Sequence, residues 1–303
     1  MNISAPPDGR AGITADLVSR LIAAQFPQWK GLPVAPVPVD GHDNRTYRLG
    51  ETMTVRLPTA AGYAPAVLKE SDWLPRLGPH LPVAVPEVLA TGAPGEDYPH
   101  PWSVRSWLEG ETADPARVGD MTAFAVQVAE FVRALWRCDA TGGPPAGEHS
   151  FWRGASPGHY DADTRRYLTE LDGHLDTGLA AETWQAALDA RWTGRPVWFH
   201  GDVAAGNLLV AGGELTAVID FGTSGVGDPA CDLVIAWTMF GGASREAFRA
   251  AVGGDPGLWA RARGWALWKA LLMLTLTLGS DPAAATEHRR IVTDVLSDHL
   301  AHA

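Results

Sequence analysis

The sequence of 303 residues is poor in lysine and in cysteine. Lys30, Lys69 and Lys269 are the only lysines among its 24 basic residues, and the other 21 are arginines. No Gly-Lys pair occurs, which excludes a Walker A nucleotide-binding loop. No G-x-G-x-x-G sequence is present either, which weakens any case for a Rossmann dinucleotide site. Cys138 and Cys231 form no C-x-x-C or Cys/His cluster, which argues against a zinc site and a disulfide framework. Such cysteine usage favours a cytoplasmic location.

The sequence also lacks segments typical of export signals or membrane spans. The first ten residues contain no basic region followed by an apolar core. The most apolar stretch, residues 265–279, is interrupted by Lys269, so it predicts a buried helix. Acidic residues outnumber basic ones by 35 to 24, giving a net charge of −11. This excess argues against nucleic acid as a partner and is compatible with a cationic small molecule, although it is equally typical of soluble enzymes.

Segments rich in β-forming residues dominate the first third of the chain. A helix over residues 14–26, with Thr14 as its N-cap, precedes them, and a second helix is predicted over 64–78. The apolar positions of the second helix are Val67, Leu68, Leu74 and Leu77. The β-rich segments are residues 32–40, 44–50, 52–58, 86–92 and 101–108. We predict a five-stranded sheet with one helix inserted after its third strand.

Helical patterns dominate the remainder of the chain. We therefore predict an α+β protein with two lobes. A small β-rich lobe spans residues 1–105, and a larger, mainly helical lobe spans 106–303. The predicted oligomeric state is a monomer or a weak homodimer.

The most informative segment is residues 197–233, "VWFHGDVAAGNLLVAGGELTAVIDFGTSGVGDPACDL". Two strand-like runs flank the predicted hairpin turn "AGGEL". Asp202 and Asn207 precede this hairpin and Asp220 follows it, so the hairpin can bring them to one place. Carboxylate and amide oxygens are the ligands that Mg²⁺ prefers, and a further carboxylate remains to act as a base. These are the groups that phosphoryl transfer requires.

The order H-G-D-x-x-x-x-N followed by D-F-G resembles the aminoglycoside phosphotransferase and choline kinase family of protein-kinase-like small-molecule kinases. The resemblance implies a two-lobed kinase fold, Asp202 as the catalytic base, and Asn207 and Asp220 as Mg²⁺ ligands. It implies ATP or GTP as the co-substrate. His200 is expected to support the loop by hydrogen bonding, with a role as general base as the alternative. Further supports are expected at two acids of "GDPACDL": Asp232, and Asp228 as an N-cap before Pro229.

The same resemblance places the nucleotide on the first lobe. Arg56 stands where the family usually has a lysine, Glu70 would orient it, and Lys69 is the alternative cation. Asn44, with the backbone of residues 41–46, is a candidate for phosphate contact, and an ordinary hairpin turn is the alternative. Candidates for contact with the base, mainly through their backbone, are Ser103, Arg105, Ser106 and Trp107.

The resemblance leaves the acceptor open. Asp161, Asp163 and Trp237 are weak candidates for binding it, because charges on a helix are commonly solvated and tryptophans are commonly core residues. We predict transfer of the γ-phosphoryl group to a hydroxyl of an antibiotic-like acceptor, an aminoglycoside or a related natural product. A metabolic kinase of an amino alcohol or sugar, and a non-catalytic nucleotide-binding regulator, are the alternatives. A G-x-S-x-G match at residues 154–158 does not indicate a hydrolase, since Pro157 lacks the N–H that an oxyanion hole needs.

Overall fold

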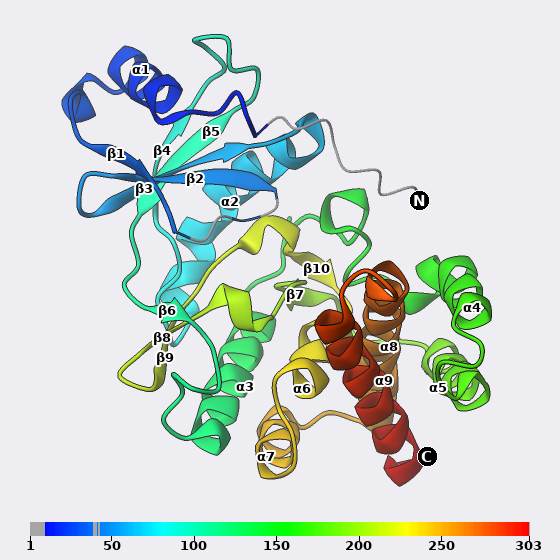
Figure 1. Ribbon diagram of the computed structural model, residues 1–303. Helices are drawn as coiled ribbons and strands as arrows, with labels where there is room; N and C mark the ends of the chain where they lie inside the picture. Colours follow the sequence, from blue (N-terminus) through cyan, green and yellow to red (C-terminus); the bar gives the residue numbers. More distant parts are fainter. Residues whose placement is uncertain (1–9, 39–40, 42, 303) are drawn as a thin grey trace. The chain divides into compact units, whose positions relative to one another are not determined.

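The computed structural model describes residues 10–38, 41 and 43–302 (Figure 1). The chain forms two compact units. The first comprises the chain up to Gly110 together with Thr216–Gly222, and the second comprises Glu111–Leu215 and the chain from Thr223 onward. Among the described residues, no helix combines the length and apolarity that crossing a membrane requires.

The first unit contains an antiparallel sheet of five strands in the order β1-β2-β3-β5-β4 (Figure 1). Its strands are β1 (Val34–Pro36), β2 (Asn44–Leu49), β3 (Met53–Pro58), β4 (Val88–Gly92) and β5 (Trp102–Ser106). Helix α1 (Ala15–Gln25) precedes the sheet and helix α2 (Ala64–Leu77) follows its third strand. Thr14 caps α1, since its Oγ1 accepts a hydrogen bond from Leu17 N. The predicted five strands, inserted helix and N-cap are confirmed.

The two faces of this sheet carry different chemistry. Side chains alternate along a strand, so Val55 and Leu57 of β3 lie in the apolar core with α1, and Arg56 between them points to the other face. The same alternation in β5 places Val104 in the core with α1, and Arg105 opposite. Strand pairing therefore gathers two arginines on the face that α2 covers.

Helix α2 presents an acid to that face. Its buried positions are Val67, Glu70, Leu74 and Leu77, which follow the three- and four-residue spacing of one helix face. Leu68, which the sequence grouped with Val67, Leu74 and Leu77 as apolar positions of the helix, is 52% exposed, and Glu70 lies on the buried face instead. Apolar content alone could not reveal this, because the buried carboxylate is there to meet the arginines of the sheet.

Thr216–Gly222 belongs to the first unit although it lies far along the chain. Ala84 N donates to Thr216 O at 3.1 Å, and Val218 N donates to Ala84 O at 3.0 Å. Asp220, which follows these contacts, therefore belongs to the first unit and not to the C-terminal part in which the sequence placed it.

The second unit is mainly helical. Its helices are α3 (Met121–Arg137), α4 (Asp161–Glu170), α5 (Thr177–Asp189), α6 (Ile235–Thr238), α7 (Ala243–Val252), α8 (Pro256–Thr277) and α9 (Pro282–His302). Its strands are β6 (Glu111–Thr112), β7 (Val197–Phe199), β8 (Leu208–Ala211), the start of β9 (Glu214–Val218) and β10 (Gly225–Gly227). The 3-10 helices that bear on the site are η6 (Ala205–Asn207) and η8 (Pro229–Val234).

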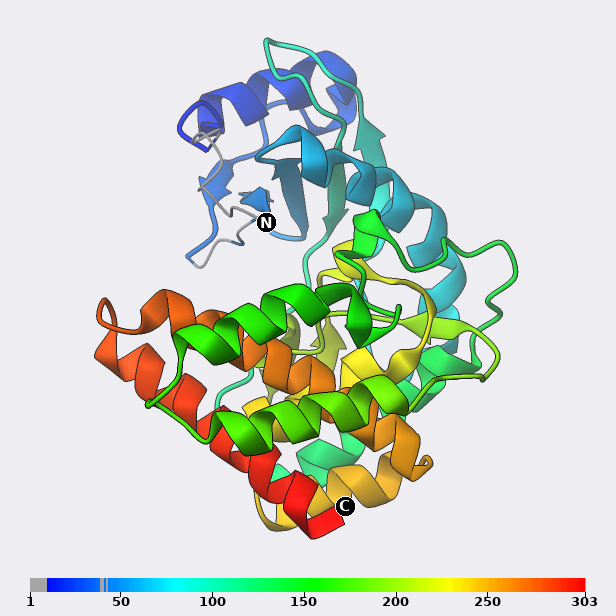
Figure 2. The same cartoon turned by 90° about the vertical axis from the view of Figure 1, so that its right-hand side faces the viewer.

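Helix α8 lies at the centre of this unit. It packs against α4, α5 and α9, and Figure 2 shows the green α4 and α5 lying beside the orange α8. Its residues from Leu258 to Leu274 are largely buried, which confirms the buried helix predicted around Trp265. Lys269 interrupts this buried run.

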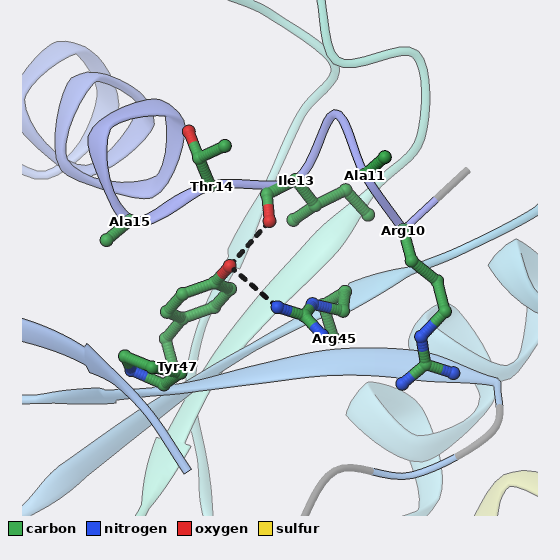
Figure 3. A pocket seen from close by; sticks show the side chains of 8 residues that line it. Arg10, Ala11, Ile13, Thr14, Ala15, Arg45 and Tyr47 are labelled. Carbon is green, nitrogen blue, oxygen red and sulfur yellow. Dashed lines mark hydrogen bonds between the residues drawn. The ribbon is translucent and has the colours of Figure 1, made fainter. Parts of the chain in front are cut away.

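A hollow of about 530 Å³ lies beside the start of α1 in the first unit (Figure 3). It is lined by Arg10, Ala11, Ile13, Thr14, Ala15, Pro36, Arg45 and Tyr47. Tyr47 Oη donates to Ile13 O and accepts from Arg45 Nη2, and these bonds connect β2 to the chain before α1 (Figure 3). Of the predicted site residues, the lining of the hollow includes only Arg45, from the segment 41–46.

Candidate active site

A buried acid, Asp232, forms hydrogen bonds with the backbone of the loop between β7 and β8. Asp232 accepts hydrogen bonds from the backbone N–H groups of His200 at 3.0 Å and Gly201 at 2.7 Å. Gly201 has φ 83°, and a Cβ there would come within 2.9 Å of Thr223 O, so the turn requires glycine. His200 is fully buried and its Nδ1 accepts from Asp202 N at 3.2 Å. His200 and Asp232 support the loop, and burial removes His200 from the role of general base.

Asp202 and Asn207 contact each other on this loop. Asn207 Nδ2 donates to both Asp202 O and Asp202 Oδ2, each at 2.9 Å. The amide nitrogen of Asn207 is thereby engaged by Asp202, so its carbonyl oxygen is the side-chain atom that could accept a cation. The side chain of Asp202 is 34% exposed and can meet a substrate.

Asp202 carries a positive partner that the sequence did not indicate. Lys269 Nζ of α8 lies 3.2 Å from Asp202 Oδ1. Burial opposes ionisation of Asp202, but the positive field of Lys269, Arg153 and His200 outweighs it and holds the pKa of Asp202 below its ordinary value. Asp202 is therefore a carboxylate at neutral pH.

The first unit brings together a second group of charges around Glu70. Arg105 donates to both carboxylate oxygens of Glu70, with Nη2 2.7 Å from Oε2 and Nη1 2.9 Å from Oε1. Arg56 Nη1 lies 3.6 Å from Glu70 Oε1, and Arg56 Nη2 donates to Asp220 Oδ1 at 3.0 Å. Burial raises the pKa of Glu70, but the two arginines outweigh it and the net pKa is lowered. Glu70 thus orients Arg56, as predicted, and binds Arg105 more closely.

Asp220 sits at the end of this chain of ion pairs. Its φ of 65° places it in the left-handed region, which aspartate tolerates better than most residues. Burial opposes the charge of Arg56, but Asp220 and Glu70 outweigh that effect and raise its pKa. A fixed cation and a carboxylate are therefore paired directly after β9.

Lys69, the alternative cation, lies next to Glu70 on α2. Burial lowers the pKa of Lys69 from 10.5 to about 8, although Glu70 and Asp220 act in the opposite direction. Arg56 makes the direct contacts with Glu70 and Asp220, so the structure favours Arg56 as the main cation.

The lowered pKa of Lys69 predicts a pH-dependent stability. Between pH 8 and 10.5 the unfolded chain holds the Lys69 proton more tightly than the folded protein does, so the free energy of unfolding gains a contribution as pH rises. We expect Lys69→Met to stabilise the protein relative to wild type at pH 7, and this advantage to shrink by pH 9.5. Urea denaturation of both proteins at each pH measures the difference. A constant difference would contradict the shifted pKa.

Several groups predicted to contact the base already form hydrogen bonds within the first unit. Ser106 N donates to Glu87 O and Trp107 N donates to Thr52 O, so these backbone donors are already used. Ser103 is buried and accepts from Arg105 Nε, and the ring of Trp107 lies under the guanidinium of Arg48 at 3.8 Å. Two of the predicted donors, Ser106 N and Trp107 N, are therefore engaged within the first unit, and contact of the base with the other backbone groups of residues 103–107 stays a prediction.

The predicted phosphate turn is described only in part. Asn44 begins β2 opposite Pro58 and is buried, so its side chain is not on an exposed turn. Of the backbone segment 41–46, residue 42 lies outside the described residues, and residues 44–46 belong to β2.

Asp228 is confirmed as an N-cap: its Oδ1 accepts from Ala230 N at the start of η8. The same carboxylate is bound by Arg261 of α8, with Nε 2.7 Å from Oδ2. Both partners are buried, so this ion pair connects η8, which carries Asp232, to the central helix.

The weak acceptor candidates have structural partners. Asp161 accepts from Trp184 Nε1 at 2.8 Å and pairs with Arg165, and Asp163 pairs with Arg166. Trp237 is wrong as an acceptor contact: it is fully buried and packs edge-on against Trp259. Burial of tryptophan in the helical core explains the error.

Sequence reasoning missed Lys269, Arg153 and Arg261. A lysine inside the most apolar helix was the available signal, since a charged residue in a buried run needs a partner. Arg153 and Arg261 had no comparable signal, because their partners lie far away in the sequence.

The fold and these charge clusters define a protein-kinase-like phosphotransferase. Residues 34–266 match the family model described as the phosphotransferase enzyme family, and the chain belongs to this family of kinases, which transfer phosphate to hydroxyl acceptors. Similar solved structures include the macrolide 2'-phosphotransferase MphH from Brachybacterium faecium, at 26% identity, TM-score 0.60, and coverage of 93% of this chain and 97% of that one.

Two aminoglycoside enzymes share the fold at lower identity. The GDP complex of aminoglycoside 2'-phosphotransferase-IIIa is 18% identical with TM-score 0.71, covering 95% of this chain and 100% of that one. The streptomycin–ATP complex of APH(2'')-IIa is 16% identical with TM-score 0.58, covering 94% and 96%. No curated protein matches the chain.

Proposed function

We propose that this kinase transfers the γ-phosphoryl group of ATP or GTP to a hydroxyl of a natural-product antibiotic, with Mg²⁺ as the cofactor. The observation that carries the proposal is Asp202: a partly exposed, ionised carboxylate that contacts Asn207 and Lys269. The antibiotic class is supported by similar structures named for aminoglycoside and macrolide phosphotransfer.

The donor set fits Mg²⁺. Among the described residues, no group of three or more His, Cys, Asp or Glu side chains is placed to hold a metal by itself. Mg²⁺ is commonly held by one or two protein oxygens together with phosphate oxygens and water, so a full protein cage is not needed. Asn207, with its amide nitrogen turned to Asp202, and Asp220 would hold it. When bound, the ion neutralises charge on the phosphates.

Each protein residue then has a defined task. Arg56, fixed by Glu70 and Asp220, binds phosphate oxygens of the nucleotide. Asp202 accepts a hydrogen bond from the acceptor hydroxyl and takes its proton as the new O–P bond forms and the bond to the leaving diphosphate breaks. Lys269 keeps Asp202 ionised until that proton arrives.

The proposal predicts Mg²⁺-dependent phosphorylation of an antibiotic. We would incubate the enzyme with ATP or GTP, separately, and a panel of aminoglycosides, macrolides, peptide antibiotics, amino alcohols and sugars, and detect phosphorylated product by mass spectrometry. We expect product from at least one antibiotic and its loss with EDTA. Product from an amino alcohol or sugar alone would favour a metabolic kinase, and nucleotide binding without any product would favour a regulator.

A further inference from the structure

Positively charged side chains lie around Asp202, the carboxylate proposed to take the proton of the acceptor hydroxyl. Within the second unit, the cations that act on Asp202 are Lys269, at 3.2 Å, and Arg153. The Lys269 side chain is 41% exposed, so its charge is presented to a bound molecule as well as to Asp202. A hydroxyl that approaches this carboxylate therefore meets Lys269, which pairs with it, and the further positive charge of Arg153.

The acids of α4, and Asp281 and Glu287 on the side of α9, each have a partner of their own. On α4, Arg166 binds both Asp163 and Glu170 at 3.0 Å, and Arg165 pairs with Asp161. On the side of α9, Glu287 pairs with Arg290, and Asp281 accepts from Ala284 N. Each acid of the helix that the sequence offered as a binding site for a polycation is thus paired with an arginine of the same helix.

Aromatic rings extend from Lys269 to the surface. Trp268, the residue before Lys269, stacks on Tyr160 with ring centroids 4.1 Å apart. The guanidinium of Arg153 lies 5.9 Å from the Trp268 ring and 5.6 Å from the Phe151 ring. Trp152 stacks on His159 at 4.1 Å.

This cluster ends in rings that a ligand can reach. Phe151 and Trp152 are 37% and 38% exposed, so these two large apolar side chains lie at the surface and not in the core. Both have positive φ angles, 49° and 60°, so the backbone holds them in a turn that side chains rarely adopt. Exposed rings beside a cation offer an apolar face together with a site for negative or neutral oxygen groups.

We propose that the acceptor is a neutral or anionic alcohol with an aromatic or apolar face, and not a polycation. The inference rests on the proposed phosphoryl transfer and names its substrate class. Lys269 and Arg153 repel a polyamine at the reacting carboxylate, while Phe151 and Trp152 provide contact area for a flat apolar surface. Arg153 already covers the Phe151 ring, so that face does not remain open to a ligand cation.

The test compares binding of two probes of different charge. Calorimetry would measure the Kd of chloramphenicol, a neutral aromatic alcohol, and of kanamycin, a polyamine, with a non-hydrolysable ATP analogue present. We expect wild type to bind chloramphenicol more tightly. Arg153→Glu should shift the ratio of the two Kd values toward kanamycin by roughly five- to tenfold, the scale of an exposed charge contact reversed in sign.

Controls separate charge at the site from total charge. Arg191→Glu changes net charge equally at an exposed position after α5 and should leave the ratio unchanged. Arg153→Gln should give a smaller shift in the same direction as Arg153→Glu, and Trp152→Ala should weaken chloramphenicol alone. Tighter binding of kanamycin by wild type, or equal shifts in Arg153→Glu and Arg191→Glu, would overturn the inference. Turnover is measured in a separate assay, and absence of product from every acceptor would contradict the kinase proposal. The ratio of the two Kd values would still decide which class of acceptor the site binds.

Discussion

Replacing Asp202 by alanine is expected to lower kcat by about 10²- to 10⁴-fold, the range over which a positioned acid or base contributes to catalysis. The variant loses the acceptor for the hydroxyl proton and the partner of Asn207 Nδ2 and Lys269 Nζ. Steady-state kinetics with the best acceptor of the panel measures the loss. Because Arg56, Glu70 and Asp220 are untouched, the Kd for nucleotide should change little.

Asp202→Asn is the matched variant for this experiment. It keeps the size of the side chain and a hydrogen-bond acceptor, but it removes the negative charge and the capacity to take a proton. We expect its kcat to fall nearly as far as that of the alanine variant, with the fold retained. Near-normal turnover in either variant would refute the assignment of Asp202 as the base.

Replacing Glu70 by alanine is expected to lower the free energy of unfolding by about 3–5 kcal/mol, the cost of leaving one member of a buried ion pair alone. Glu70 and Arg105 are 3% and 2% exposed, and two hydrogen bonds join them. The change also removes the carboxylate beside Arg56. Urea denaturation measures the stability, and nucleotide titration should show weaker binding as Arg56 loses its orientation.

A double variant separates the ion pair from the packing around it. Glu70→Leu with Arg105→Met replaces both charges by apolar side chains of similar size, so Arg105 is not left as an unpaired buried charge, and Arg56 keeps Asp220 as its partner. We expect it to be more stable than either single variant, in a thermodynamic cycle that gives the coupling between the two positions. Additive effects of the two changes would show that Glu70 and Arg105 do not stabilise each other.

Much of the fold could be predicted because local patterns encode it. The five strands follow β-rich segments, α1 follows helical spacing after a Thr cap, and α8 follows the most apolar run. The errors came where position depends on distant partners. Leu68 is exposed and Glu70 is buried, because Glu70 pairs with arginines of the sheet. Trp237 is buried in the core, where it packs against Trp259 of α8.

The sequence by itself determined the reaction class, because Asp202, Asn207 and Asp220, the residues proposed for its centre, are spaced along one continuous segment. The tertiary structure alone decided which charges surround them. Arg105 reaches Glu70 across 35 residues, Arg56 reaches Asp220 across 164, and Lys269 reaches Asp202 across 67. A charge acts through distance in space, and sequence spacing does not report the contacts that folding creates between remote segments.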